Sequence, residues 1–259
     1  STWPRVGLVL GCLGVNTVQQ SSYGRMDVSN GAELIVQHPN GLNRADPPYF
    51  KWHSCGFRIA EGSKMIMSGL YPIDCFIPVE MNGGELRLGG ETPQPGNFNC
   101  YLQSITFRGG LMTGQRPRVG NNADTRWFVR GAAPSTCESG ANLFGPRQFI
   151  LAVEDVTRDA DVDFTMSGII ANGDNSLGSA VVKQGPGTAL LSAANTYDGE
   201  TRIEEGVLRF GVSGAVLDTN VVRMAGGTLS LAAGTATTLG QLTFAADEDG
   251  VGATAAVDF

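Results

Sequence analysis

The chain has 259 residues, of which 36 are Gly and only 17% are charged, and its formal net charge is −7. There is no Gly-X-Y period and no apolar run long enough to cross a bilayer, which excludes a collagen-like chain and a membrane-spanning helix. Residues 1–150 carry 13 basic and 10 acidic side chains, whereas residues 151–259 carry 5 and 15. With so acidic a second half, a nucleic-acid partner is not expected.

The chain begins with an apolar stretch and continues with short segments that share one pattern. The sequence of Val6–Val15 (VGLVLGCLGV) favours a buried first strand over the remnant of a signal sequence. In each later segment, alternating apolar residues stand on both sides of a glycine, as expected for two half-buried strands joined by a tight turn. These segments are Asp27–Val36, Arg58–Met67, Val79–Leu88, Thr106–Met112, Arg202–Phe210 and Arg223–Leu231.

The turn glycines recur at a loose period. They are Gly31, Gly62, Gly83 and Gly109 in the first half, and Gly206 and Gly226 in the second. A period of roughly 20–30 residues indicates a solenoid. We therefore predict an all-β, single-stranded parallel β-helix, in which each period is one rung and the inward side chains form one continuous core. A β-sandwich, in which turn signals also recur at short intervals, is the alternative.

Segments rich in Pro, Asn and Arg interrupt this pattern in the first half. Pro39–Cys55, Glu91–Cys100 and Gly114–Gly145 are predicted to be loop excursions, the last with a strand at Trp127–Val129. From about Phe149 the pattern becomes regular. We therefore divide one continuous stack into irregular rungs over residues 1–148 and regular rungs over residues 149–259, where Ala253–Phe259 still has the pattern of a strand.

Glycine, threonine and leucine recur in a fixed order from Lys183 to Leu208. The order is Lys183-x-Gly185-x-Gly187-Thr188, Leu191-Ser192, Asn195-Thr196-Tyr197-x-Gly199, Thr201-x-Ile203 and Gly206-x-Leu208. Together with Phe164–Ile170 before it and Gly226–Leu231 after it, this order resembles the passenger-associated strand repeat of bacterial autotransporters over about residues 160–245. The resemblance implies a right-handed parallel β-helix that is secreted or displayed at the bacterial surface. It implies no activity.

Several positions in the repeat have expected places in a rung. Inward positions are predicted at Leu191, Ile203, Leu208, Leu229 and Leu231. Asn195 is predicted at a turn, where its amide can bond the backbone. Either a ladder of asparagines in successive rungs or a solvated side chain fits that position.

The residues offer little catalytic chemistry. The two histidines, His38 and His53, are predicted to lie on the surface in or beside a loop, and Gly173–Ser176 lacks the Gly-Asp-Ser-Gly order of a serine protease nucleophile. We therefore predict no enzyme and assign no catalytic, cofactor-binding or metal-binding residue.

One acidic triplet carries a separate prediction. Asp159, Asp161 and Asp163 have the period-two spacing that places side chains on one face of a strand. We predict a solvated outer face, with a calcium site as the alternative.

Arginines and cysteines concentrate in the first half. The arginines Arg116, Arg118, Arg126, Arg130 and Arg147 lie near Trp127 in the sequence and suggest a site for an acidic glycan or for the acidic half of a neighbouring copy. The interpretation that we favour is nevertheless that they are ordinary loop arginines that cover apolar surface. The cysteines are Cys12, Cys55, Cys75, Cys100 and Cys137, with no C-x-x-C pair. They are either buried thiols or include a disulfide, for which Cys55 and Cys75, about one rung apart, are the preferred pair.

Taken together, these patterns predict a structural or adhesive β-solenoid that is secreted or displayed at the bacterial cell surface. Its expected partners are further copies of itself, joined head to tail into a filament or surface layer, and a surface glycan or a ligand on a host or neighbouring cell. The alternatives are a polysaccharide-degrading β-helix enzyme, either lyase or hydrolase, and a phage-type receptor-binding spike.

Overall fold

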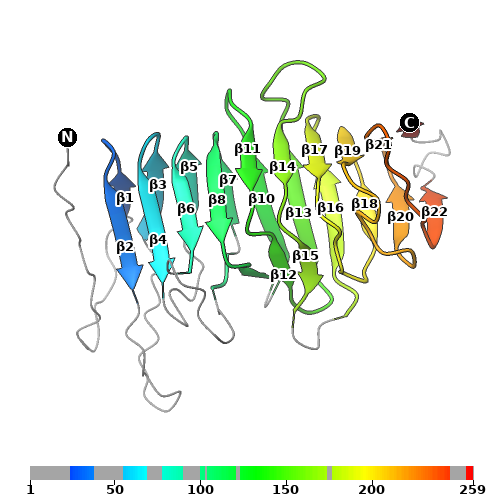
Figure 1. Ribbon diagram of the computed structural model, residues 1–259, viewed down its shortest axis with the longest axis horizontal. Coiled ribbons are helices and arrows are strands. Elements are labelled where there is room, and N and C mark those ends of the chain that lie inside the picture. The colour runs from blue at the N-terminus through cyan, green and yellow to red at the C-terminus, as the bar shows by residue number, and fades with distance from the viewer. Residues whose placement is uncertain are drawn as a thin grey trace, which may run out of the picture.

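The computed structural model describes residues 24–37, 55–68, 78–89, 100–102, 104–120, 123–173, 177–245 and 255–258. In these ranges the chain is all β, and its strands form two long sheets and one short sheet. The strands stack side by side from the N-terminal to the C-terminal end of an elongated molecule (Figure 1). The predicted all-β parallel solenoid is confirmed, and the sandwich alternative is wrong. The predicted strand Val6–Val15 and most of the loops Pro39–Cys55 and Glu91–Cys100 lie outside the described residues.

Neighbouring strands within each sheet are parallel and come from successive rungs. The first sheet contains, in spatial order, β1 (Gly24–Val28), β3 (Cys55–Ala60), β5 (Val79–Asn82), β7 (Ser104–Phe107), β10 (Thr125–Val129), β13 (Gln148–Val153), β16 (Ala180–Gln184), β18 (Thr201–Ile203), β20 (Val221–Met224) and β22 (Gln241–Phe244). The second sheet contains β2 (Glu33–Gln37), β4 (Lys64–Ser68), β6 (Glu85–Leu88), β8 (Gly110–Gly114), β11 (Ser135–Cys137), β14 (Phe164–Met166), β17 (Thr188–Leu191), β19 (Val207–Phe210), β21 (Gly227–Leu231) and β23 (Ala255–Asp258). The third sheet contains β9 (Arg118–Val119), β12 (Ala141–Leu143) and β15 (Ile170–Asn172).

The register of the first sheet shows that the later rungs have nearly equal lengths. Val181 aligns with Thr201, Thr201 with Val222, and Val222 with Leu242. Each step lies at the short end of the range expected for a repeat architecture, and it moves the chain by one strand spacing of about 4.8 Å along the stack. Strand pairing also continues without a break through residue 148, because β13 pairs with β10 on one side and with β16 on the other.

The predicted turn glycines join the first-sheet strand to the second-sheet strand of the same rung. They have the left-handed φ that such turns require, with values of +73° at Gly31, +71° at Gly62, +80° at Gly83, +78° at Gly109 and +66° at Gly206. In the later turn the left-handed residue is Gly227, at +67°, and not the predicted Gly226. Gly226 is needed for space instead, since a Cβ there would lie 2.3 Å from the carbonyl oxygen of Glu204.

Aromatic side chains fill the core of the central rungs. Trp127 on β10 is completely buried, and its ring packs edge-on against Phe149 with the centroids 4.8 Å apart. Phe107 packs in the same way against Phe164, which belongs to the second sheet, at 5.0 Å. The Trp127 indole N–H donates to the carbonyl of Leu102 at 3.2 Å, so its one polar atom is satisfied inside the core. Trp127 is therefore a core residue, and the predicted strand at Trp127–Val129 is confirmed.

The core of the later rungs follows the predicted inward positions. Leu191, Ile203, Leu208 and Leu229 are buried, as predicted. Leu231 is only half-buried and packs against the edge of the core. These side chains stack on one another from rung to rung, since Leu208 aligns with Leu229 in the parallel register.

The predicted loop excursion Gly114–Gly145 is wrong. This segment contains β9, β10, β11 and β12, and so supplies most of one rung as well as two of the three strands of the third sheet. Its strands are short, from the two-residue β9 to the five-residue β10. Strands this short are held by pairing with the rungs on both sides, which no local sequence pattern records.

Regularity begins later than predicted. The step from Phe149 to its partner Val181 is longer than the steps that follow it, because a long loop between β13 and β14 is inserted into this rung (Figure 1). The shorter, nearly equal steps start at Val181 and not at Phe149.

Candidate functional site

The third sheet defines a corner in three successive rungs. Its strands follow the second-sheet strands after corners of three residues, namely 115–117, 138–140 and 167–169. Glycine allows these corners to stack closely, since a Cβ at Gly168 would lie 2.1 Å from the backbone nitrogen of Gly140. Gly140 itself has a φ of +72°, which other residues rarely adopt. The three corners therefore lie directly above one another along the solenoid axis.

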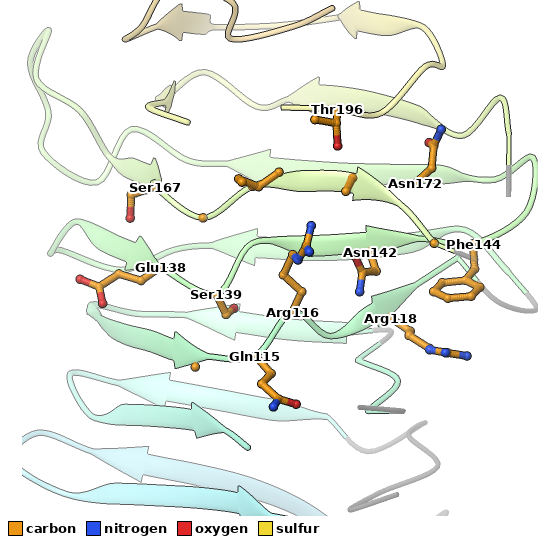
Figure 2. Close-up of a pocket in the computed structure, with 15 residues that line it drawn as sticks. Gln115, Arg116, Arg118, Glu138, Ser139, Asn142, Phe144, Ser167, Asn172 and Thr196 are labelled. Atoms are coloured by element: carbon orange, nitrogen blue, oxygen red, sulfur yellow. The ribbon is translucent and has the colours of Figure 1, made fainter. Parts of the chain in front are cut away.

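These corners line an open groove of about 840 Å³ on the outside of the solenoid (Figure 2). We call it the corner groove. Its lining residues are Gly114, Gln115, Arg116, Arg118, Glu138, Ser139, Asn142, Phe144, Ser167, Gly168, Ile169, Ala171, Asn172, Gly173 and Thr196. The groove is large enough for an extended ligand and crosses at least three rungs.

Arg118 is held in place on one side of the corner groove. Its guanidinium lies over the ring of Phe144, 4.4 Å from the centroid, and also beside the ring of Tyr101 at 5.7 Å. One of its nitrogens donates to the Tyr101 hydroxyl at 3.2 Å. These contacts fix the position of one positive charge before any ligand arrives.

Arg116 differs from Arg118 because its side chain has no hydrogen-bond, ion-pair or aromatic partner among the described residues. It is exposed, and it projects across the groove between Ser139 and Asn142 (Figure 2). Proline follows at position 117, and Arg118 begins β9, so this side chain lies at the corner of its rung. Its guanidinium can therefore donate paired hydrogen bonds to an incoming anion.

The rest of the lining is mostly uncharged. Asn142, Asn172 and Thr196 place amide and hydroxyl groups along the groove, and Ile169 adds an apolar side chain that is 42% exposed. Most of these residues were not predicted as site residues. The available signal was the Ser-Gly pair that recurs at 139–140 and 167–168, in both cases shortly before an asparagine.

Glu138 is the only carboxylate among the described lining residues, and it lies on the side of the groove opposite Phe144 (Figure 2). Glycoside hydrolysis typically uses two carboxylates that flank the scissile bond. The lining supplies hydrogen-bond donors, acceptors and positive charge, which suit binding rather than this two-carboxylate chemistry.

The predicted arginine cluster is divided between two faces of the solenoid. Arg116 and Arg118 line the corner groove, whereas Arg126 and Arg130 lie on the outer face of the first sheet. There both guanidiniums lie near the ring of Phe128, at 5.8 and 4.2 Å from its centroid. The sequence places these arginines close together, but the turn between β9 and β10 separates them.

The face with Arg126 and Arg130 has a smaller hollow of about 440 Å³. Arg130 pairs there with Glu154 at 3.2 Å, and the far side of the hollow is formed by Glu204 and Glu205. Its positive charge is thus largely balanced by acidic side chains. This hollow is a weaker candidate for an anion site than the corner groove.

The period-two prediction for Asp159, Asp161 and Asp163 is wrong. They belong to the loop before β14, which is not a strand. The carboxylate of Asp159 accepts a hydrogen bond from the backbone of Asp161 at 2.8 Å, and both residues are exposed. Asp163 is fully buried and does not share a face with them.

Asp163 instead closes the loop before β14 on itself and holds it to β17. One oxygen accepts from the backbone N–H of Val156 and from the N–H and hydroxyl of Thr157, at 2.8 to 2.9 Å. The other accepts from the backbone N–H of Thr188 in the next rung at 2.7 Å. These donors satisfy the buried charge, so the carboxylate has a structural role.

Lys183, the first residue of the repeat, is buried in the inward column of the first sheet. It aligns with Leu151 in one rung and Ile203 in the next, which are both core residues. Its ammonium group donates to the carbonyls of Gln184, Gly185 and Glu205, at 2.6 to 3.1 Å. Burial lowers the pKa of Lys183 from 10.5 to about 8, although the negative charges of Glu205 and Asp163 oppose that shift.

The two buried asparagines of the repeat region bridge rungs through the backbone. The Asn195 oxygen accepts from the N–H of Ile170 at 2.7 Å, and its nitrogen donates to the carbonyl of Ala215 at 2.6 Å. Asn220 donates to the Gly199 carbonyl and accepts from the Thr201 hydroxyl. The solvated alternative for Asn195 is therefore wrong. Its amide joins three successive rungs through backbone groups and not through an asparagine ladder.

The remaining predicted chemistry is only partly within the described residues. Cys100 and Cys137 are buried free thiols, and burial raises the pKa of Cys137 to about 11. Cys12, Cys75, His38, His53 and residues 174–176 lie outside the described residues, as does the side chain of Cys55. Within the described ranges no group of three or more His, Cys, Asp or Glu side chains is placed to hold a metal ion. The same ranges contain no helix long and apolar enough to span a membrane.

Comparison with known proteins identifies one repeat in the chain. No curated protein and no solved structure matches the sequence. A family model described as Passenger-associated-transport-repeat matches residues 181–210, which extend from β16 to the end of β19. The resemblance inferred from the order of glycine, threonine and leucine is confirmed by this match. Residues 181–210 thus match a passenger-associated transport repeat, and they are set within a parallel β-solenoid.

Proposed function

We propose that this protein is an adhesive β-solenoid displayed at the bacterial surface, and that it binds its ligand in the corner groove. The passenger-associated repeat at residues 181–210 supports export and surface display. The observation that carries the binding function is that Arg116 has no side-chain partner among the residues the structure describes, in a groove lined by hydroxyl and amide groups across three rungs. A rigid scaffold with polar side chains directed into one open groove is suited to recognition.

In this proposal the protein acts by binding and not by catalysis. The groove has one carboxylate, Glu138, among its described lining residues, whereas polysaccharide hydrolysis commonly needs a pair. The surrounding side chains, such as Asn142 and Asn172, are neutral amides that can form hydrogen bonds with hydroxyl and with carboxylate groups. The enzyme alternative is therefore less well supported.

Adhesion can be tested by filling the groove. Asn142 is a half-buried groove residue on β12, and Asn142→Tyr places a ring in the lining. Thr136→Tyr on β11 of the same rung is the matched control, since Thr136 is equally half-buried and lies outside the groove. Beads coated with each variant would be counted on bacterial and host cells. We expect attachment by the wild type and by Thr136→Tyr, and its loss with Asn142→Tyr. Equal attachment of both variants, or none by the wild type, would contradict the proposal.

A second proposed function is head-to-tail assembly, favoured by apolar exposure on β22. In the first-sheet register, Leu242 and Phe244 continue the inward columns of Val222 and Met224. Those two residues are completely buried, but Leu242 is 37% and Phe244 is 59% exposed. The opposite net charges of residues 1–150 and 151–259 favour contact between unlike ends of two copies.

Assembly would be measured by sedimentation velocity at low and high salt. We expect species larger than the monomer at micromolar concentration and low salt, and fewer of them at high salt because the attraction is screened. Phe244→Ser should shift the distribution towards monomer, whereas the exposed control Leu177→Ser should not. A monodisperse monomer at low salt would refute assembly while leaving the adhesive function untouched.

A further inference from the structure

We infer that the corner groove binds a linear acidic polysaccharide, a polymer of uronate sugars, with the polymer chain lying along the solenoid axis. This inference rests on the adhesive function proposed above and specifies its ligand. Three observations carry it: the groove presents side chains at regular intervals along the axis, the groove contains arginines, and the backbone of the central strand β12 is paired on both sides.

The repetition favours a polymer that runs along the axis. Arg118, Asn142 and Ala171 occupy equivalent positions on β9, β12 and β15 in the parallel register. Successive rungs thus present side chains at intervals of about 4.8 Å in one line. A ligand lying parallel to the strands would contact the corner of only one rung, whereas a ligand lying along the solenoid axis contacts all three corners.

The charge favours carboxylates on that polymer. Arg116 is exposed and has no side-chain partner in the described part of the chain, while Arg118 is held against Phe144. The segment from 101 to 150 is rich in arginine and poor in acidic residues, in a protein whose net charge is −7. Guanidinium groups bind carboxylates through paired hydrogen bonds. Glu138 and Arg118 lie on opposite sides of the groove, so beside a polymer that runs along the axis Glu138 opposes an anion on its own side only.

The uncharged lining favours a sugar over a peptide. Asn142, Asn172 and Thr196 match hydroxyl groups along a chain, and the exposed Ile169 offers an apolar contact for the C–H face of a ring. A peptide that extends a sheet needs an unpaired strand edge. The central strand β12, which lies in the groove wall, is paired on both sides by β9 and β15.

The test compares binding of short alginate oligomers, which are linear uronates, with binding of their methyl esters, which lack the charge. Isothermal titration at low salt would use the whole chain. Arg116→Gln removes the guanidinium that projects into the groove, and Arg223→Gln, at an exposed position on β20, removes one charge outside the groove as the matched control. We expect the wild type and Arg223→Gln to bind alike, and Arg116→Gln and the methyl ester to lose about tenfold or more in affinity.

Each other outcome overturns the inference in a distinguishable way. Equal loss in both arginine variants would show attraction by overall charge only. Equal binding of the methyl ester would show that the carboxylate is not read, and a preference for sulfated over carboxylated oligomers would show a different anion. In these cases loss of bead attachment by Asn142→Tyr would still support the adhesive function. If no oligomer binds and Asn142→Tyr attaches as well as the wild type, both the inferred ligand and the proposed adhesive function are refuted. Circular dichroism would verify that each variant keeps its strand content.

Discussion

Replacing Lys183 with Met removes the ammonium group that the solenoid buries in its core. Because burial lowers the pKa of this lysine from 10.5 to about 8, the folded protein binds fewer protons than the unfolded chain between these two pH values. The free energy of unfolding therefore rises with pH through this window. Burying the charged ammonium group thus destabilises the folded protein. This destabilisation is fully present below pH 8 and decreases as the pH rises.

The size of the effect follows from the shift. A change from 10.5 to about 8 corresponds to a penalty of roughly 3.4 kcal/mol at neutral pH, at about 1.36 kcal/mol per pKa unit. Of this, about 1.3 kcal/mol is relieved between pH 7 and pH 9. The Lys183→Met variant has no ammonium group at this position, so its unfolding free energy does not contain this pH-dependent contribution. The difference in unfolding free energy between the two proteins should therefore move by about 1.3 kcal/mol in favour of the wild type. Cys137, whose pKa is raised to about 11, destabilises both proteins equally as the pH passes 9, and its contribution cancels.

The assay is urea unfolding followed by circular dichroism at pH 7, 8 and 9. An NMR titration of the Lys183 ammonium gives the pKa directly, and the sequence contains only three lysines, which simplifies assignment. If the Lys183→Met variant does not fold, the NMR titration of the wild type still tests the predicted pKa. A difference in unfolding free energy that stays constant with pH, or a pKa near 10.5, would refute the reasoning.

Three further predictions concern packing, the loop before β14 and the thiols. Leu208→Ala should lower the free energy of unfolding by about 2–5 kcal/mol, because Leu208 is completely buried on β19, whereas the outward Arg209→Ala should change it little. An unchanged denaturation midpoint for Leu208→Ala would mean that the rung register is wrong. Asp163→Asn should make the loop before β14 more sensitive to protease and cost about 1–3 kcal/mol, since one oxygen is replaced by a donor that faces other donors; equal cleavage rates would contradict this. Mass spectrometry after alkylation without reductant should find Cys55 and Cys75 protected as a disulfide, and free alkylation of both would reject the pair.

The sequence by itself determined the features that depend on one residue or on a short pattern. The turn at Gly62 was predictable because a left-handed φ is a local property that glycine adopts at little cost. The inward position of Leu208 was predictable because alternation along a strand assigns every second side chain to the core. Repetition of these local signals at a loose but recurring interval was sufficient to predict the solenoid.

Tertiary structure decided the features that depend on the neighbouring rung. β9 has only two residues and is a strand because β12 pairs with it, so its segment resembled a loop in the sequence. Asp163 is buried because Thr157 and Thr188, which are distant from each other in the chain, supply donors to its carboxylate. The corner groove exists because Gly140 and Gly168, one rung apart, stack almost in backbone contact. Pairing, burial and concavity in a solenoid are properties of adjacent rungs, and the order of residues within one rung does not record them.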